Sequence, residues 1–348
     1  MSGLRTGYST GACAAGAAKA AALALSGTGE VTAVDIPFPD GTRHQFPVAW
    51  VRRSEGCAEA AVRKDAGDDP DVIHGSLILA SVQFQEGTEI KFAGGEGIGT
   101  VTKPGLQVPP GEPAVNPAPR KMIWEAVREV TARGVQVTLS IPGGCALALR
   151  TFNPRLGIVG GLSIIGTSGY VRPFSVPALR VSLKCALDIA ASCGVRDVVL
   201  APGNIGERAA RHHFRLTAEQ VVQVSNEWGY MLEAARNRFE NILLIGHPGK
   251  LAKLADGGWD THSARSASAL AIVLRIAATL GLAVNRESPT VEGLFEPLQP
   301  PDRLLLGNIL ANAVRRKVEA RLARAVAVLL PNMNTEILGA DGDLSPWR

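Results

Sequence analysis

The chain has 348 residues, enough for two domains, and its 46% hydrophobic and 20% charged residues are ordinary for a globular protein. A net charge of +4 without any run of Lys or Arg, with only 5% aromatic residues, argues against nucleic-acid binding and fits a small anionic ligand better. The five cysteines lack a Cys-x-x-Cys spacing and the six histidines lack a metal-ligand spacing, so we expect neither disulfides nor a protein-bound metal.

No uncharged apolar run is long enough to cross a membrane, because the best candidate, residues 267–278, is interrupted by Arg275. The alanine-rich start resembles a signal peptide up to Ala22-Leu-Ala24, but Lys19 and several glycines interrupt it. We therefore expect a cytoplasmic protein that is neither exported nor bound to a membrane.

The first predicted element is a helix of alanine and glycine that follows a polar loop, Arg5 to Thr10. Ser9 or Thr10 is a natural N-cap, because a short hydroxyl side chain accepts from the free amides of the first helical turn. Gly11 leaves those amides unshielded, so this helix start, with Arg5 nearby, is a candidate anion site. A closely packed core helix with an ordinary cap is the alternative.

The remaining pattern of residues 1–150 predicts a mixed α+β domain with Gly-rich loops. Strands are expected over 31–38, 43–51, 57–64, 77–84, 89–92 and 135–141, and a helix over 124–133. Asp40-Gly41 marks a hairpin turn between the first two strands. The segment 94–119 is dense in Gly and Pro, which is typical of a functional or a disordered loop.

Residues 151–348 predict a parallel-sheet, Rossmann-like α/β domain, because short apolar strands alternate with helices. Strands are expected over 197–201, 241–245 and 326–330, and helices over 178–193, 226–238, 264–280 and 303–325. Thr217 to Gln220 resembles a capping box that leads into a helix. The loops 202–207, 246–250 and 331–334 are expected at the carboxyl edge of the sheet, where α/β proteins bind their ligands.

Two glycine loops resemble nucleotide-binding motifs only in part. Gly95, Gly97 and Gly99 follow a predicted strand, but the proline-rich residues after them cannot open the helix that a dinucleotide fold requires. The segment 246–250 lacks the glycine of the Walker pattern, where Leu244 stands, and its Ser or Thr, where Leu251 stands. We therefore interpret the Gly95 loop as a substrate contact and 246–250 as a backbone-lined ligand site. For 246–250, and likewise for 202–207, a tight strand-to-helix turn is the alternative.

Two histidine motifs stand out. His262, in Thr261-His-Ser263, is a candidate general base or ligand contact, with a purely structural role as the alternative. His212-His213 lies beside basic residues and is expected to form a solvated helix end.

Seven segments together resemble the cobalt-precorrin-5B C1-methyltransferase (CbiD) family of anaerobic cobalamin biosynthesis, in the family's order and over nearly the whole chain. They are 4–15, 99–105 with 111–117, 161–173, 202–207, 225–226, 246–250 and 261–263. Tyr170 and Trp228 depart from the smaller or aliphatic residues that we expect in the family, and these departures could reshape a pocket.

The resemblance implies methyl transfer from S-adenosylmethionine to ring carbon C1 of a cobalt-bearing tetrapyrrole, with the cobalt belonging to the substrate. It implies cofactor contacts from Gly203, Asn204, Gly206, Glu207, Gly246, Gly249 and Lys250. Counter-charges and donors for the substrate carboxylates would come from Arg5, Ser9, Thr10, Gly11, Lys103 and Arg172. His247 or His262 would accept a proton if the reaction needs one.

The competing hypothesis is an α/β protein that uses the same loops to bind an anionic metabolite without methyl transfer. The sequence leaves open a homo-oligomer, and also whether a cobalt-containing or a metal-free tetrapyrrole is preferred.

Overall fold

The computed structural model describes residues 3–27 and 29–348, which belong to two compact units, unit 1 (Met1–Ser175) and unit 2 (Val176–Arg348). The division therefore falls at Ser175 and not at residue 150. The reason is that two late strands, β9 (Ile158–Val159) and β10 (Tyr170–Val171), return to pair with β7 (Thr100–Val101) and β1 (Gly7–Tyr8) of the same unit.

Unit 1 has the expected α+β character. Its other elements are α1 (Thr10–Leu25), β2 (Ala33–Pro37), β3 (Arg43–Ser54), β4 (Cys57–Arg63), β5 (Leu77–Gln85), β6 (Ile90–Gly94), α2 (Pro117–Arg128), β8 (Gly134–Ser140) and α3 (Gly144–Ala148). The main sheet has the order β2-β3-β4-β5-β8-β6 and is antiparallel except for β6 beside β8. Helix α2 begins at Pro117, earlier than predicted, because proline is tolerated in a first turn, where its missing amide has no partner to lose.

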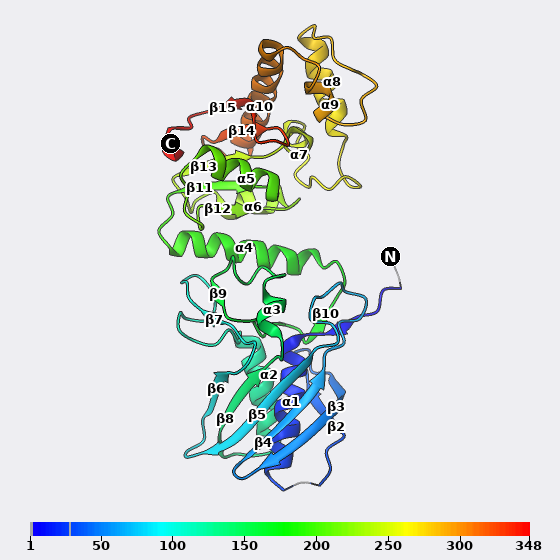
Figure 1. The fold of residues 1–348 in the computed structure, drawn as a ribbon, viewed down its shortest axis with the longest axis vertical. Coiled ribbons are helices and arrows are strands. Elements are labelled where there is room, and N and C mark those ends of the chain that lie inside the picture. The colour runs from blue at the N-terminus through cyan, green and yellow to red at the C-terminus, as the bar shows by residue number, and fades with distance from the viewer. Residues whose placement is uncertain (1–2, 28) are drawn as a thin grey trace. The chain divides into compact units, whose positions relative to one another are not determined.

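Helix α1 forms the centre of the unit 1 core. It lies along one face of the sheet and also contacts α2 (Figure 1). Twelve of its first thirteen residues, Thr10 to Ala22, are buried, and the exception is Lys19. Small side chains permit this double burial, because a larger residue would hold either the sheet or α2 away from the helix axis.

The two glycines of α1 provide a matched test of this packing. A Cβ added to Gly11 would lie 2.8 Å from Pro119 Cγ and 3.0 Å from Met122 Cε of α2, whereas one added to Gly16 would lie 3.4 Å from Phe46, an ordinary contact. We expect Gly11→Ala to destabilise the protein by about 1 to 2 kcal/mol through overpacking. Gly16→Ala should be neutral or slightly stabilising, because alanine favours a helix. Thermal unfolding measures both, and equal stabilities would contradict the packing role of Gly11.

A cluster of charged side chains joins α1, α2 and the first hairpin. The carboxylate of Glu129, at the end of α2, accepts hydrogen bonds from Arg43 at 2.8 Å and from Lys19 of α1. Lys19 also donates to the backbone oxygen of Asp35 in β2 at 2.6 Å. The hydrogen bonds from Arg43, followed by those from Lys19, lower the pKa of Glu129 to about 2.

This lowered pKa predicts an acid-sensitive contribution to stability. A carboxylate whose pKa falls from 4.5 to about 2 on folding stabilises the native state above pH 4.5, and that stability is lost as the pH falls towards 2. We expect Glu129→Gln to reduce the loss of stability over this range, measured by urea unfolding at several pH values. Glu125→Gln on the same helix is the control, and an unchanged pH profile in Glu129→Gln would exclude the contribution.

Unit 2 has the expected parallel sheet. Its elements are α4 (Val176–Ser192), β11 (Asp197–Ala201), α5 (Asn204–His213), β12 (Val221–Gln223), α6 (Trp228–Ala235), β13 (Asn241–Ile245), α7 (Pro248–Ala255), α8 (Ala269–Thr279), α9 (Glu292–Phe295), α10 (Pro300–Leu322), β14 (Ala327–Pro331), β15 (Ile337–Asp341) and a 3-10 turn (Ser345–Trp347). In the order β12-β11-β13-β14-β15, the first four strands are parallel and β15 is antiparallel.

In unit 2 one sequence-based expectation was wrong, and two predicted helices are present but shorter than expected. The capping-box pattern at 217–220 does close a turn, in which Gln220 Oε1 accepts from the Thr217 amide at 2.9 Å. The next residues, however, form β12 beside β11, because two valines favour a strand where a partner is available. The helix expected over 226–238 is only α6, and α8 begins at Ala269 rather than at residue 264.

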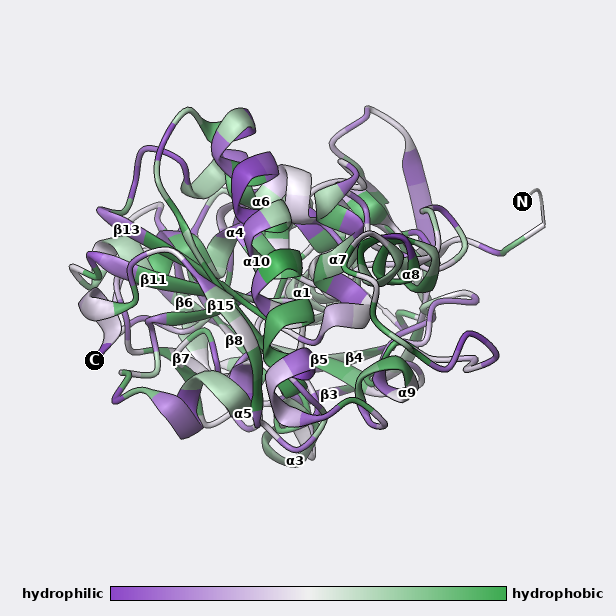
Figure 2. Ribbon diagram, turned by 90° about the horizontal axis from the view of Figure 1, so that it is seen from above, coloured by the Kyte–Doolittle hydropathy of each residue, from purple (hydrophilic) through white to green (hydrophobic). Residues whose placement is uncertain are grey.

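The chain changes faces of the sheet between β11 and β13. Helix α5, after β11, covers one face, where it packs on Val199 and Ala201. Helices α7, α8 and α10, after β13, cover the other face, where they share a core with Val198 and Leu200 of β11. Figure 2 shows the apolar character of β11 and β13, which lie between these two layers. The carboxyl ends of β11 and β13 are therefore the topological switch point, where doubly wound sheets bind ligands.

Candidate functional site

Two loops meet at the switch point through their glycines. A Cβ on Gly206 would lie 2.6 Å from the backbone oxygen of Ile245, and one on Gly246 would lie 2.8 Å from Pro202. Gly206 therefore permits a close approach to the backbone of β13, and Gly246 leaves room for the ring of Pro202 and the side chain of Leu251. A Cβ on Gly203 would meet nothing within 4 Å, so the backbone there borders open space.

An amide side chain from β12 orients the acidic residue in the first turn of α5. Gln223, the last residue of β12, donates to Glu207 Oε2 at 2.7 Å and to Asn204 Oδ1 at 3.0 Å. Arg211 lies 3.3 Å from Glu207 Oε1. The structure thus brings together Asn204 and Glu207, as expected, and adds Gln223, which no sequence motif marks.

His247 uses both of its ring nitrogens for structure. Its Nδ1 accepts from the Gly249 amide at 3.0 Å and so caps α7, while Nε2 lies 2.5 Å from Glu292 Oε2. This pattern places the ring proton on Nε2, which donates a hydrogen bond to the carboxylate. In this arrangement no ring lone pair of His247 remains to accept another proton. Glu292 also accepts from the amide of Met333 at 3.4 Å, which joins the loop after β14 to the loop after β13.

His262 differs from His247 in having one ring nitrogen available. Its Nδ1 accepts from the Ala264 amide at 3.2 Å, and among the described residues no hydrogen bond involves its Nε2. The neutral ring therefore carries its proton on Nε2. The same segment is attached to the carboxyl edge by Thr261, whose amide donates to the backbone oxygen of Asn226 at 3.1 Å. Lys250 also reaches Asn226, donating to its Oδ1 at 2.8 Å.

The unit 1 candidates divide into buried and exposed residues. Ser9 is the N-cap of α1, as predicted, and its Oγ accepts from Ala12 at 3.1 Å. Gly11 donates its amide to Ile165 at 2.9 Å. These first-turn amides are thus paired within the chain, although the sequence suggested that they would be open to an anion. Thr10 is buried beside them.

The cationic candidates of unit 1 have different surroundings. Arg5 forms a two-pronged ion pair with Asp65 and thereby lowers the pKa of that carboxyl to about 2. The stem of Lys103 packs on Gly157, where a Cβ would come within 2.6 Å. Arg172 is exposed and forms no ion pair with another described residue. The antiparallel pair of β1 and β10 sets Tyr8 opposite Tyr170, so it brings the segments around Arg5 and Arg172 together.

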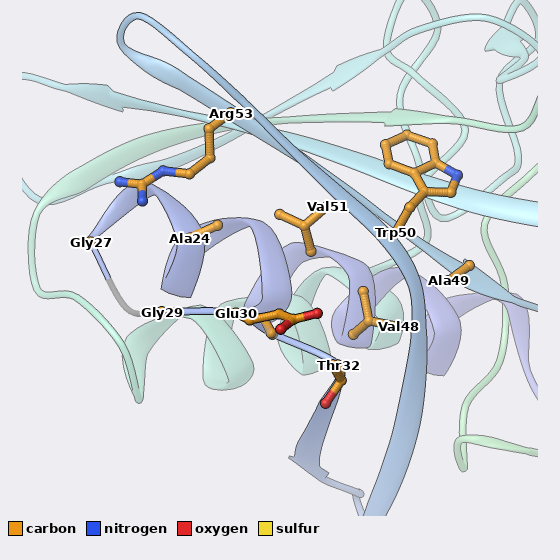
Figure 3. A pocket seen from close by; sticks show the side chains of 11 residues that line it. Ala24, Gly27, Gly29, Glu30, Thr32, Val48, Ala49, Trp50, Val51 and Arg53 are labelled. Atoms are coloured by element: carbon orange, nitrogen blue, oxygen red, sulfur yellow. The ribbon is translucent and has the colours of Figure 1, made fainter.

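A hollow of about 560 Å³ lies in unit 1 between β3 and the last turn of α1. Figure 3 shows Val48 and Val51 of β3 pointing towards this turn near Ala24, with Glu30 and Thr32 beside them. None of the site residues predicted from the sequence lines it. The hollow therefore does not coincide with the candidate site.

The described part of the chain contains neither a cluster of metal ligands nor a candidate membrane span. No group of three or more His, Cys, Asp or Glu side chains is arranged to hold a metal ion. No helix combines the length and the apolar character that a membrane span needs.

The geometry of His247 predicts a defined tautomer. Nitrogen NMR should show His247 protonated at Nε2, and Glu292→Ala should destabilise the protein by about 1.5 kcal/mol, because a charge-assisted hydrogen bond is lost. Glu292→Gln keeps an acceptor oxygen and should retain the tautomer. Glu296→Ala is the control for loss of a nearby carboxylate. A proton on Nδ1 in the unmodified protein would refute the assignment.

Comparisons with known proteins match both units. The family model described as CbiD matches residues 1–173. A protein of Syntrophotalea carbinolica named cobalt-precorrin-5B C(1)-methyltransferase is 52% identical over 351 residues and covers 100% of both chains. One of Ralstonia nicotianae with the same name is 41% identical, covering 98% of this chain and 94% of its own. A crystal structure of the cobalamin biosynthesis protein (cbiD) from Archaeoglobus fulgidus is 26% identical, has a TM-score of 0.40, and covers 80% of this chain and 85% of its own. By its full-length identity to the curated relatives, the chain belongs to the CbiD family of cobalt-precorrin-5B C(1)-methyltransferases.

Proposed function

We propose that this chain methylates C1 of cobalt-precorrin-5B in cobalamin biosynthesis, with S-adenosylmethionine as the methyl donor. The observation that carries the proposal is the 52% identity over the full length of a relative named for this reaction. Coverage of both units matters, because it includes the switch-point loops as well as the N-terminal segment. The cobalt is part of the substrate, a cytoplasmic location belongs to the same proposal, and the tetrapyrrole is its small-molecule partner.

The switch point of unit 2 fits S-adenosylmethionine, which when bound supplies a methyl group already activated on a sulfonium. The task of the chain is therefore to align the reactants and to exclude water. Glu207, oriented by Gln223, has carboxylate lone pairs suited to ribose hydroxyls. The open space at Gly203 admits a ligand close to the backbone. Gly206 and Gly246 permit the close packing of the two loops, and Asn204 and Lys250 supply polar contacts. The amide of Gly249 is capped by the side chain of His247.

Unit 1 supplies the counter-charges for the tetrapyrrole carboxylates in this proposal. Arg172 and Lys103 are assigned the main roles, because a guanidinium or an ammonium group suits a carboxylate. Arg5 is already neutralised by Asp65 and would contribute less. Ser9, Thr10 and Gly11 act by holding the neighbouring loop, since the amides of Gly11 and Ala12 are engaged within the chain.

The two histidines receive different roles. Transfer of a methyl cation raises the charge of the macrocycle by one, and loss of a proton restores it. We assign His262 as the acceptor of that proton, for which Nδ1 must release the Ala264 amide. His247 is assigned to positioning, because both of its nitrogens are occupied.

The reaction itself is tested by anaerobic incubation with S-adenosylmethionine and cobalt-precorrin-5B. Mass spectrometry should show the gain of one methyl group, and NMR with a labelled methyl should place it at C1. No gain, together with no binding of S-adenosylhomocysteine, would favour the binder of an anionic metabolite.

The role of His262 predicts a loss of turnover in His262→Gln by about a hundredfold, because general base catalysis contributes that much. The affinity for S-adenosylhomocysteine should stay unchanged, and His212→Gln is the control for loss of an imidazole from unit 2. Unaltered turnover in His262→Gln would remove this residue from the mechanism.

A further inference from the structure

Three segments distant in sequence converge on Asn226 in unit 2. Asn226 lies just after β12, Lys250 lies in the first turn of α7, and Thr261 lies in the loop after α7. Lys250 Nζ donates to Asn226 Oδ1 at 2.8 Å, and Thr261 Oγ1 donates to the same oxygen at 3.3 Å. The oxygen of this side-chain amide is thus occupied by two donors.

The occupied oxygen determines what Asn226 offers to a ligand. Because Oδ1 faces Lys250 and Thr261, the Nδ2 group points elsewhere, and no described residue accepts a hydrogen bond from it. Nδ2 can only donate. The preceding residue, Ser225, has a φ of +54°, a strained left-handed conformation that the fold maintains at this point. The left-handed backbone of Ser225 and the unused Nδ2 donor of Asn226 thus lie in the same turn.

Two ammonium groups lie at this turn without a counter-ion. Lys253 is 6% exposed, and its Nζ donates to Thr261 O at 3.1 Å and Ser266 Oγ at 2.8 Å, both neutral. Neither Lys250 nor Lys253 forms an ion pair with any carboxylate of the described residues; the nearby Asp260 is paired with Arg265 at 2.6 Å. Burial, followed by the charge of Lys250, lowers the pKa of Lys253. The turn therefore combines surplus positive charge with unused donors.

We infer that Asn226 and Lys250, supported by the charge of Lys253, form a binding site for a carboxylate group. An anion would supply the acceptor that Asn226 Nδ2 lacks and the negative charge that the two lysines lack. This inference rests on the proposed function, whose two ligands both carry carboxylates: the amino-acid end of the methyl donor and the side chains of the tetrapyrrole. Lys253 is a positioning residue, since its ammonium group holds the 261–266 segment.

The two sources of carboxylate are separated by titration calorimetry with two probes. S-adenosylhomocysteine carries the carboxylate, whereas 5′-methylthioadenosine lacks the whole amino-acid end. The variants are Lys250→Met, which removes the charge, and Asn226→Asp, which keeps the shape but replaces the donor by a repelling oxygen. Lys121→Met, on an exposed side chain of α2, is the matched control. Melting temperatures verify that each variant is folded.

If the site takes the cofactor carboxylate, both variants should weaken S-adenosylhomocysteine binding by about tenfold or more and leave 5′-methylthioadenosine unchanged. If it takes a tetrapyrrole carboxylate, nucleoside binding should stay constant and the KM for cobalt-precorrin-5B should rise by a similar factor. Folded variants with neither effect would overturn the carboxylate site. Failure of the proposed function is distinct, because the unmodified protein would then neither bind S-adenosylhomocysteine nor methylate the tetrapyrrole.

Discussion

The burial of α1 is the constraint on which unit 1 depends. A helix that packs against both a sheet and a second helix must be thin, and alanine and glycine are the residues that make it so. Its position then determines where the N-terminal segment lies, because Ser9 both caps the helix and contacts the later segment at Gly166, where a Cβ would come within 2.2 Å of its Oγ. The first turn of α1 thus packs two distant segments together, and in the proposed function a ligand would be held by side chains around it.

Unit 2 depends instead on side chains that connect the loops after different strands. Gln223 connects the end of β12 to the loop after β11, and Glu292 connects the loops after β13 and β14. Asn226 connects the segment after β12 to α7 and to the loop beyond it. Each contact fixes one loop relative to its neighbour, and in the proposed function these contacts would preorganise a cofactor site made of separate loops.

In the proposed function, polar groups that are paired within the chain hold local structure, whereas polar groups without a partner are the candidates for contact with a ligand. His247, Gln223 and the first-turn amides of α1 are engaged by partners within the chain and so stabilise local structure. Nε2 of His262 and Nδ2 of Asn226 have no hydrogen-bond partner among the described residues. Groups of the second kind are the ones that gain most from a ligand, because a new hydrogen bond there does not replace an existing one.

The sequence by itself determined the features that depend on near neighbours and on short motifs. The period of apolar residues predicted the parallel strands of unit 2, the hydroxyl of Ser9 predicted the N-cap, and motifs in order identified the family. Only the tertiary structure decided that the turn at 217–220 leads into a strand, that unit 1 extends to Ser175, and that Gly11 faces α2. It also decided the hydrogen bonds of Glu292 and Asn226, which lie 45 and 24 residues from their partners His247 and Lys250. The physical reason is that caps and periodicity act within a few residues, whereas strand pairing, close packing and the occupancy of a ring nitrogen depend on which distant segments the topology brings into contact.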